Sequence, residues 1–182
     1  MRKNLICLLM CLFAINTFAQ PEKGFTVGID YRWCVKPTLK KSSDFMSSDF
    51  VSTFGYQFNK YLSVRVPVSR EIALFDKDGL KTWVSNQVLG LGMGVNVFVR
   101  EDGAGFFELN ASAGSTLDGD DTWKYAYYDA GFNIVLGQTI KANLGFGARY
   151  YDARRGKNRL TMYGILGLQV NINATFKKIL AK

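Results

Sequence analysis

The 182-residue chain contains no histidine, and it has only three cysteines and three prolines. Imidazole is the side chain that ordinarily changes its protonation near neutral pH, so catalysis that relies on a histidine base is excluded. Cys7 and Cys11 lie within the first twenty residues, which leaves Cys34 and predicts no disulfide in the remaining chain. No segment after residue 24 shows the 3.6-residue period of an amphipathic helix.

The first nineteen residues have the features of a secretory signal peptide. Arg2 and Lys3 give a positive start, residues 5–15 are apolar, and residues 17–19 form a cleavage site with small side chains. We expect cleavage after Ala19, which leaves about 160 residues, enough for one domain. Removing two of the 23 basic residues leaves 21 against 15 acidic ones. An exported chain with this basic excess is expected to meet anionic lipid or polysaccharide, and not nucleic acid.

From residue 24 onward, apolar and polar side chains alternate in eight stretches. In the last stretch, Leu166, Leu168 and Val170 alternate with residues that include Gln169 and Asn171. Successive side chains of a strand point to opposite faces, so each stretch predicts a β-strand with one apolar and one polar face. The predicted strands are residues 24–34, 49–58, 61–70, 86–99, 106–115, 125–136, 140–151 and 160–176.

The connections between the predicted strands alternate between short and long. The short ones are expected to be tight turns, with glycine and asparagine where the backbone needs them. Outer-membrane barrels show this asymmetry, together with an even number of strands and both termini on the periplasmic side. The expected turns are residues 59–60, 100–105 and 137–139, and the expected long loops are residues 35–48, 71–85, 116–124 and 152–159.

Two eight-stranded architectures fit these strands, and they differ in which face lies inside. A soluble, lipocalin-like barrel has its apolar face inside, whereas a membrane barrel has its polar face inside. Here the polar face is rich in glycine, serine and asparagine, with single charges of both signs, which suits a narrow lumen better than a water-facing surface. The sequence therefore predicts an all-β, eight-stranded antiparallel up-and-down transmembrane β-barrel.

This prediction divides the chain into a signal peptide over residues 1–19, the barrel over residues 20–176 and a basic tail over residues 177–182. Charges of opposite sign on the polar face are expected to compensate one another inside the lumen. The expected lumen network consists of Asp30, Arg32, Arg65, Glu108, Asp129, Lys141 and Arg149.

Aromatic side chains gather near the strand ends that adjoin the predicted long loops. Membrane barrels place aromatic girdles at both interfaces with water, and we expect such a girdle here. The alternative is that these side chains fill the mouth of a soluble barrel. The residues concerned are Tyr31, Trp33, Trp123, Tyr125, Tyr127, Tyr128, Tyr150 and Tyr151.

The architecture of residues 24–176, and the final strand ending in Phe176, resemble the small outer-membrane β-barrel proteins of the OmpA-, OmpX- and OmpW-like kind. The resemblance implies the outer membrane of a Gram-negative cell and recognition of a final aromatic residue by the barrel assembly machinery. It also implies a structural, adhesion or partner-binding role through surface loops, with a narrow, porin-like conduit for small solutes as the alternative. Six residues follow Phe176 here, which departs from the family pattern.

Acidic residues in the predicted loops are weak candidates for a metal site or for acid–base catalysis. Asp76 and Asp78 resemble the start of a calcium loop, but the glutamate that would complete it is missing. Asp118, Asp120 and Asp121 offer oxygen ligands or an acid–base pair, yet aspartate and glycine together are ordinary turn chemistry. We expect no catalytic residue, no metal, no cofactor and no enzyme activity.

The densest basic loop is expected to contact lipopolysaccharide, because guanidinium groups bind phosphate in a two-pronged geometry. The expected partners are therefore outer-membrane lipids, including lipopolysaccharide, and the protein is expected to be a monomer. The contacting residues would be Arg154, Arg155, Lys157 and Arg159.

Overall fold

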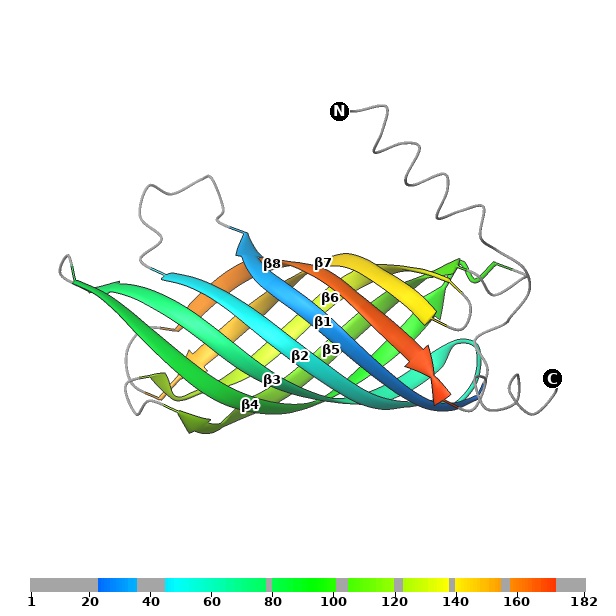
Figure 1. Ribbon diagram of the computed structural model, residues 1–182, viewed down its shortest axis with the longest axis horizontal. Helices are drawn as coiled ribbons and strands as arrows, with labels where there is room; N and C mark the ends of the chain where they lie inside the picture. Colours follow the sequence, from blue (N-terminus) through cyan, green and yellow to red (C-terminus); the bar gives the residue numbers. More distant parts are fainter. Residues whose placement is uncertain are drawn as a thin grey trace, which may run out of the picture.

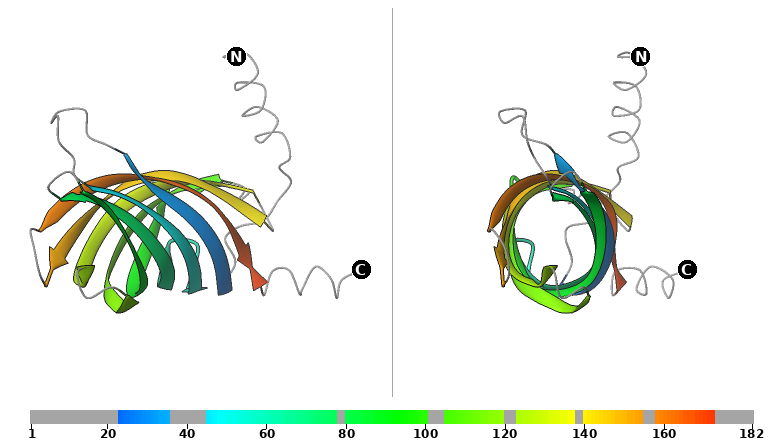
Figure 2. Two further views of the ribbon diagram at one scale, coloured as in Figure 1. Left: turned by 60° about the vertical axis from the view of Figure 1, so that its left-hand side comes forward. Right: turned by 90° about the vertical axis from the view of Figure 1, so that its left-hand side faces the viewer.

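The computed structural model describes residues 23–35, 45–77, 80–100, 105–119, 123–137, 140–154 and 158–172. Each strand pairs antiparallel with the next and β8 pairs with β1, so the sheet closes into an up-and-down barrel (Figures 1 and 2). No helix within these residues is long and apolar enough to cross a membrane. The strands are β1 (Gly24–Val35), β2 (Phe45–Gln57), β3 (Leu62–Lys77), β4 (Leu80–Val97), β5 (Gly105–Gly119), β6 (Tyr125–Leu136), β7 (Ile140–Ala153) and β8 (Arg159–Asn171).

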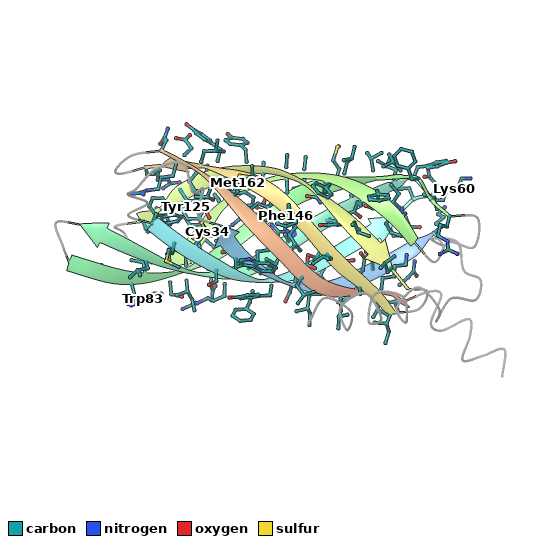
Figure 3. The ribbon with its side chains drawn as sticks, turned by 90° about the horizontal axis from the view of Figure 1, so that it is seen from above. Cys34, Lys60, Trp83, Tyr125, Phe146 and Met162 are labelled. Carbon is teal, nitrogen blue, oxygen red and sulfur yellow. The ribbon has the colours of Figure 1, made fainter. Side chains whose placement is uncertain are left out.

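The barrel has two distinct ends. We call the end where β1 begins at Gly24 and β8 ends at Asn171 the terminal end, and the opposite end the far end. The β3–β4 hairpin reaches furthest at the far end (Figure 1). Tyr125 and Lys60 lie at opposite ends of the barrel (Figure 3).

The strands at the far end are longer than the alternation predicted. β3 continues to Lys77 and β4 begins at Leu80, so only two residues connect them. The expected long loop over residues 71–85 is therefore wrong, and so is the strict alternation of long and short connections. Ala73 and Val84 point into the barrel and are buried. Because apolar side chains occupy the inner face here as well as the outer face, the contrast that marks a strand in the sequence disappears.

Strand boundaries elsewhere follow the alternation more closely. β6 occupies residues 125–136 as predicted, and β7 begins at Ile140 as predicted. β2 begins at Phe45, inside the expected long loop over residues 35–48. β8 ends at Asn171, and Phe176 lies outside the described residues.

Apolar side chains cover the outside of the barrel, and polar side chains fill the inside. Ile29 on β1 and Leu166 on β8 are 64% and 56% exposed. Glu108 and Arg149, which point inward from β5 and β7, are only 1% and 3% exposed. The wall therefore has the polarity opposite to that of a lipocalin-like barrel.

Polar side chains close the turns at the terminal end. The Oδ1 atom of Asn59 accepts hydrogen bonds from the backbone amides of Tyr61 and Leu62, at 2.8 and 3.0 Å. The Nδ2 atom of Asn96 donates to the carbonyl of Lys60 at 3.0 Å. Gly137 has a φ of +116°, which a residue with a β-carbon adopts rarely, so the β6–β7 turn depends on this glycine.

Candidate functional site in the barrel lumen

Arg149 on β7 is the centre of a charge network in the far half of the lumen. Its NH1 group donates to Asp49 on β2, while its NH2 and Nε groups lie 3.1 and 3.3 Å from Oδ2 of Asp129 on β6. Arg32 on β1 also donates to Asp129, at 3.1 Å. The guanidinium carbon of Arg149 lies 4.6 Å from the ring centre of Tyr127. One side chain therefore links two carboxylates on strands that are not neighbours and also packs on an aromatic face.

Glu71 on β3 lies beside this network and is held by two tyrosine hydroxyls. Tyr151 donates to one carboxylate oxygen at 2.9 Å, and Tyr125 donates to the other. The Oγ atom of Ser47 lies 3.3 Å from the Tyr151 hydroxyl. Glu71 is 1% exposed, so these hydrogen bonds replace the water that its carboxyl group loses on burial.

Aromatic side chains cap the network at the far end. The ring centres of Phe45 and Trp123 are 5.4 Å apart, and those of Tyr125 and Tyr151 are 4.9 Å apart. Val88 and other buried apolar side chains pack against these rings. We call this group the aromatic cap; its members are Phe45, Ala73, Val84, Val88, Trp123, Tyr125, Tyr127 and Tyr151. It separates the charges below it from the far end of the barrel.

The cap corrects the expected aromatic girdle. Trp123, Tyr125, Tyr127 and Tyr151 are only 1–3% exposed and point into the lumen, so they form no part of an outer girdle. The other four residues of that prediction, Tyr31, Trp33, Tyr128 and Tyr150, lie on the outward parity of their strands. The strand parity carried this information, because Tyr125 and Tyr127 share the parity of Asp129.

The terminal half of the lumen contains simpler pairs. Arg65 on β3 forms a two-pronged ion pair with Glu108 on β5, one prong of which measures 2.7 Å. Asn133 also donates to Glu108, at 3.2 Å. Each member of this group has one or two partners, and the pair joins strands that are separated by β4.

Asp30 and Lys141 complete this half of the lumen. Asn143 donates to Oδ1 of Asp30 at 3.3 Å. The Nζ atom of Lys141 lies 5.0 Å from the centre of the Phe106 ring, within the range of a cation–π contact.

Glycines make room for the large side chains that cross the lumen. A β-carbon at Gly90 would lie 2.0 Å from the hydroxyl oxygen of Tyr127, and one at Gly147 would lie 2.4 Å from the Tyr163 ring. These approaches are far shorter than van der Waals contact. These inner-face glycines therefore leave the space that the tyrosine side chains need.

All seven residues of the predicted lumen network lie inside the barrel. The structure brings Arg32 and Arg149 together at Asp129, and Arg65 together with Glu108, as described above. Sequence analysis missed two carboxylates, Asp49 and Glu71, which are 3% and 1% exposed. Asp49 is the first residue of the predicted second strand and has its polar parity, whereas Glu71 directly follows the predicted third strand. Carrying the parity of the third strand one residue further places Glu71 on the inner face as well.

A cavity of about 30 Å³ lies between the two halves of the lumen. Three polar atoms of its lining residues, Arg32 Nε, Asn110 Nδ2 and Asn133 Oδ1, have no hydrogen-bond partner among the described residues. A volume of this size holds about one or two waters, and two donors and one acceptor suit water as the occupant. At this level the lumen is therefore filled by side chains, apart from a cavity that holds about one or two waters.

The remaining predicted residues lie at the far end or outside the described part. Arg154 is exposed, and the guanidinium of Arg159 lies 5.2 Å from the centre of the Phe45 ring. Arg155 and Lys157 are outside the described residues, as are the side chains of Asp76, Asp78, Asp118, Asp120 and Asp121. The described residues contain no group of three or more side chains suited to hold a metal ion.

Comparison of the sequence with models of protein families and with curated proteins gives no match. Function must therefore be argued from the chemistry of the wall and the lumen. The lumen offers ionic and hydrogen-bonded links that cross the axis between distant strands, which stiffen and fill the barrel.

Proposed function

We propose that this chain is an integral outer-membrane β-barrel protein with a structural, adhesion or partner-binding role that its surface loops perform. One observation carries the proposal: the outer wall is apolar, while all but two of the charged strand side chains described lie inside. In water this arrangement would expose a continuous apolar surface, which soluble monomers avoid. In a bilayer the same surface meets acyl chains, and the closed sheet leaves no unpaired strand edge.

The height of the wall supports this proposal. β1 and β6 are the shortest strands, with 12 residues each. At about 3.3 Å per residue and a tilt near 40°, such a strand covers roughly 30 Å along the axis, against about 25 Å for the apolar band of outer-membrane barrels. Every strand is therefore long enough to span.

Outward-facing aromatic side chains occur near both ends of the wall. At the far end these include Tyr128 and Trp83, which are 58% and 67% exposed. At the terminal end they include Phe25 and Phe98, which are 61% and 84% exposed. Two aromatic zones at the two ends are what membrane–water interfaces favour.

The proposal includes the export and the location of the chain. The signal peptide over residues 1–19 would direct export, and the barrel assembly machinery would insert the chain into the outer membrane of a Gram-negative cell. Membrane lipids would surround the wall as partners, with lipopolysaccharide at the basic loop around Arg154. We propose a monomer because the closed barrel satisfies its own strand edges.

The alternative role, a narrow conduit for small solutes, has less support. Ion pairs cross the lumen between β1 and β6, between β2 and β7, and between β3 and β5. The cavity between them has a volume of about 30 Å³. Passage of a solute would require these buried pairs to separate, which is costly in a low-dielectric interior.

Fractionation and gel mobility test the proposal. The chain, expressed with its first nineteen residues in a Gram-negative host, should be found in the outer-membrane fraction and require detergent for extraction. Its migration in dodecyl sulfate gels should change on heating, because a folded barrel resists unfolding until it is heated. A chain that stays monomeric in buffer without detergent would contradict the proposal.

A substitution on the outer wall separates the membrane and aqueous environments directly. Ile29→Lys places a charge near the middle of β1, where a lipid environment should lower the free energy of unfolding by about 2–4 kcal/mol. Phe98→Lys, at an exposed turn of the terminal end, should cost about 0–1 kcal/mol. In water both lysines would be harmless, so equal and small effects in vesicles would count against a membrane location.

A further inference from the structure

Arg70 on β3 is a charged side chain on an otherwise apolar outer wall. It is exposed, whereas its neighbours Ser69 and Glu71 point into the lumen and are buried. Among the described strand side chains that face outward, only Asp152 on β7 also carries a charge. A charge in this position calls for a specific explanation, because outward charges are unfavourable beside acyl chains.

The guanidinium of Arg70 is held in place by the neighbouring strand. Its Nε group donates to Oγ of Ser85 at 2.7 Å. The two terminal amino groups of the guanidinium have no hydrogen-bond partner among the described residues. The strand register places Phe50 on one side of Arg70 and Gln87 on the other. No carboxylate among the described residues forms an ion pair with Arg70.

Apolar side chains lie on the outer wall both above and below Arg70. Val68 lies toward the terminal end, while Ile72 and Trp83 lie toward the far end and are 40% and 67% exposed. Trp83 projects from the outer side of the β3–β4 hairpin (Figure 3). It lies four residues beyond Gln87 along β4, which at about 3.3 Å per residue and a 40° tilt is roughly 10 Å along the axis.

This order fixes the depth of Arg70 in a bilayer. An exposed indole such as that of Trp83 prefers the interface at the level of the head groups. Arg70 then lies deeper, where the acyl chains begin and where a cation without a counter-ion is unfavourable. The nearest anions are the phosphates of the lipid head groups. The guanidinium of Arg70 extends toward them, because Ser85, which it contacts, lies nearer the far end than Arg70 does. Phosphate oxygens match the two terminal amino groups of an arginine fork.

We propose that Arg70 is a binding site for the phosphate of a membrane lipid, with Ser85 holding the guanidinium and Gln87 supplying an amide donor. The acyl chains of that lipid lie along the apolar strip formed by Phe50, Val68 and Leu89. This site is separate from the basic loop around Arg154, and it rests on the proposed membrane location. The ligand is a phosphorylated lipid that the protein binds through both its phosphate and its acyl chains.

Native mass spectrometry of the purified chain tests the site. The protein in a neutral detergent is titrated with bisphosphorylated lipid A and, separately, with lipid A from which both phosphates have been removed. Arg70→Gln should retain the phosphorylated lipid about tenfold less well than the wild type, because a charge-assisted contact is lost. Lys60→Gln, which removes one exposed positive charge from the terminal end of the barrel, should retain it within about twofold.

The possible outcomes separate this inference from the proposed function. Equal retention by Arg70→Gln and the wild type would overturn the site, as would equal retention of the phosphorylated and dephosphorylated lipids. Displacement of the lipid by millimolar inorganic phosphate would also overturn it, because it would show an anion site that does not use the chains. Heat-modifiable migration of the same preparation reports on the barrel itself, so a failure there would refute the membrane location and not merely the lipid site.

Discussion

The two halves of the lumen bury charge in different ways. In the far half, Arg149 contacts both Asp49 and Asp129, and a cap of aromatic rings covers the network. In the terminal half, Arg65 and Glu108 form a pair with one further hydrogen bond, from Asn133. In the far half, Arg149 and Asp129 each have two charged partners and so form a network, whereas the terminal half is built from a pair.

The difference in burial between the halves has an energetic consequence. The side chain of Arg149 is 3% exposed, and that of Arg65 is 15% exposed. Electrostatic interactions strengthen as water is excluded, and an unpaired charge becomes more costly for the same reason. Removal of one partner should therefore destabilise the barrel more in the far half than in the terminal half.

Arg149→Met should have the largest effect of the substitutions considered. It leaves Asp49 without the arginine that pairs with it and removes the cation from the Tyr127 ring. Asp129 keeps Arg32 and the hydroxyl of Ser112 as partners. Breaking a buried ion pair in this way costs about 3–5 kcal/mol, and two carboxylates are affected here. Urea unfolding of the barrel in lipid vesicles, followed by tryptophan fluorescence, measures the change.

Arg65→Met is the matched substitution in the terminal half. If it destabilises the barrel as much as Arg149→Met does, the distinction between a network and a pair is wrong.

The pair and the network should also respond differently to a second substitution. Arg65→Met alone leaves Glu108 with Asn133, and should cost about 2–3 kcal/mol. Adding Glu108→Leu removes the remaining charge, so the double variant should recover to within about 1 kcal/mol of the wild type. The same unfolding assay, applied to both single variants and the double variant, completes the cycle.

In the far half the equivalent double variant should recover much less. Arg149→Met with Asp129→Leu still leaves Asp49 buried without its arginine, and it removes the partner of Arg32 as well. Full recovery in both halves would show that the charges act pairwise throughout the lumen.

The inner and outer faces of the strands could be predicted from sequence because alternation is a local property. Residues 125–136 were predicted as a strand and form β6, with Asp129 inside and Phe132 outside. Local alternation fails where both faces have the same polarity. This happens at Ala73 and Val84, so the sequence predicts a long loop where the β3–β4 hairpin lies, and that loop includes Glu71.

The partners of the lumen side chains could not be predicted from local pattern. Glu71 on β3 meets Tyr125 and Tyr151 on β6 and β7, which lie across the lumen. Such contacts depend on how far each strand is shifted against the next around the whole barrel, a quantity that accumulates over all eight pairings. The sequence indicates which face of the sheet a residue occupies. Its position along the barrel axis can be found only when the register of all the strand pairs is known.

Substitution of a tyrosine hydroxyl in the far half should have a smaller effect on stability than the substitutions of charged residues. Tyr151→Phe removes the donor to one oxygen of Glu71 and leaves the ring in the aromatic cap. The buried carboxyl group then loses a hydrogen bond that water cannot replace, and the expected loss of stability is about 1–2 kcal/mol. The same urea unfolding assay detects a change of this size.

Tyr163→Phe is the matched control for this substitution. Its hydroxyl is buried and has no hydrogen-bond partner among the described residues, although its ring lies 5.4 Å from the guanidinium carbon of Arg32. Removing that hydroxyl should change the free energy of unfolding by less than about 0.5 kcal/mol, or should stabilise the barrel, because a buried polar group without a partner is unfavourable. If both variants lose the same stability, the loss in Tyr151→Phe does not come from its hydrogen bond to Glu71. A loss confined to Tyr151→Phe would instead identify Glu71 as the acceptor that joins the charge network to the aromatic cap.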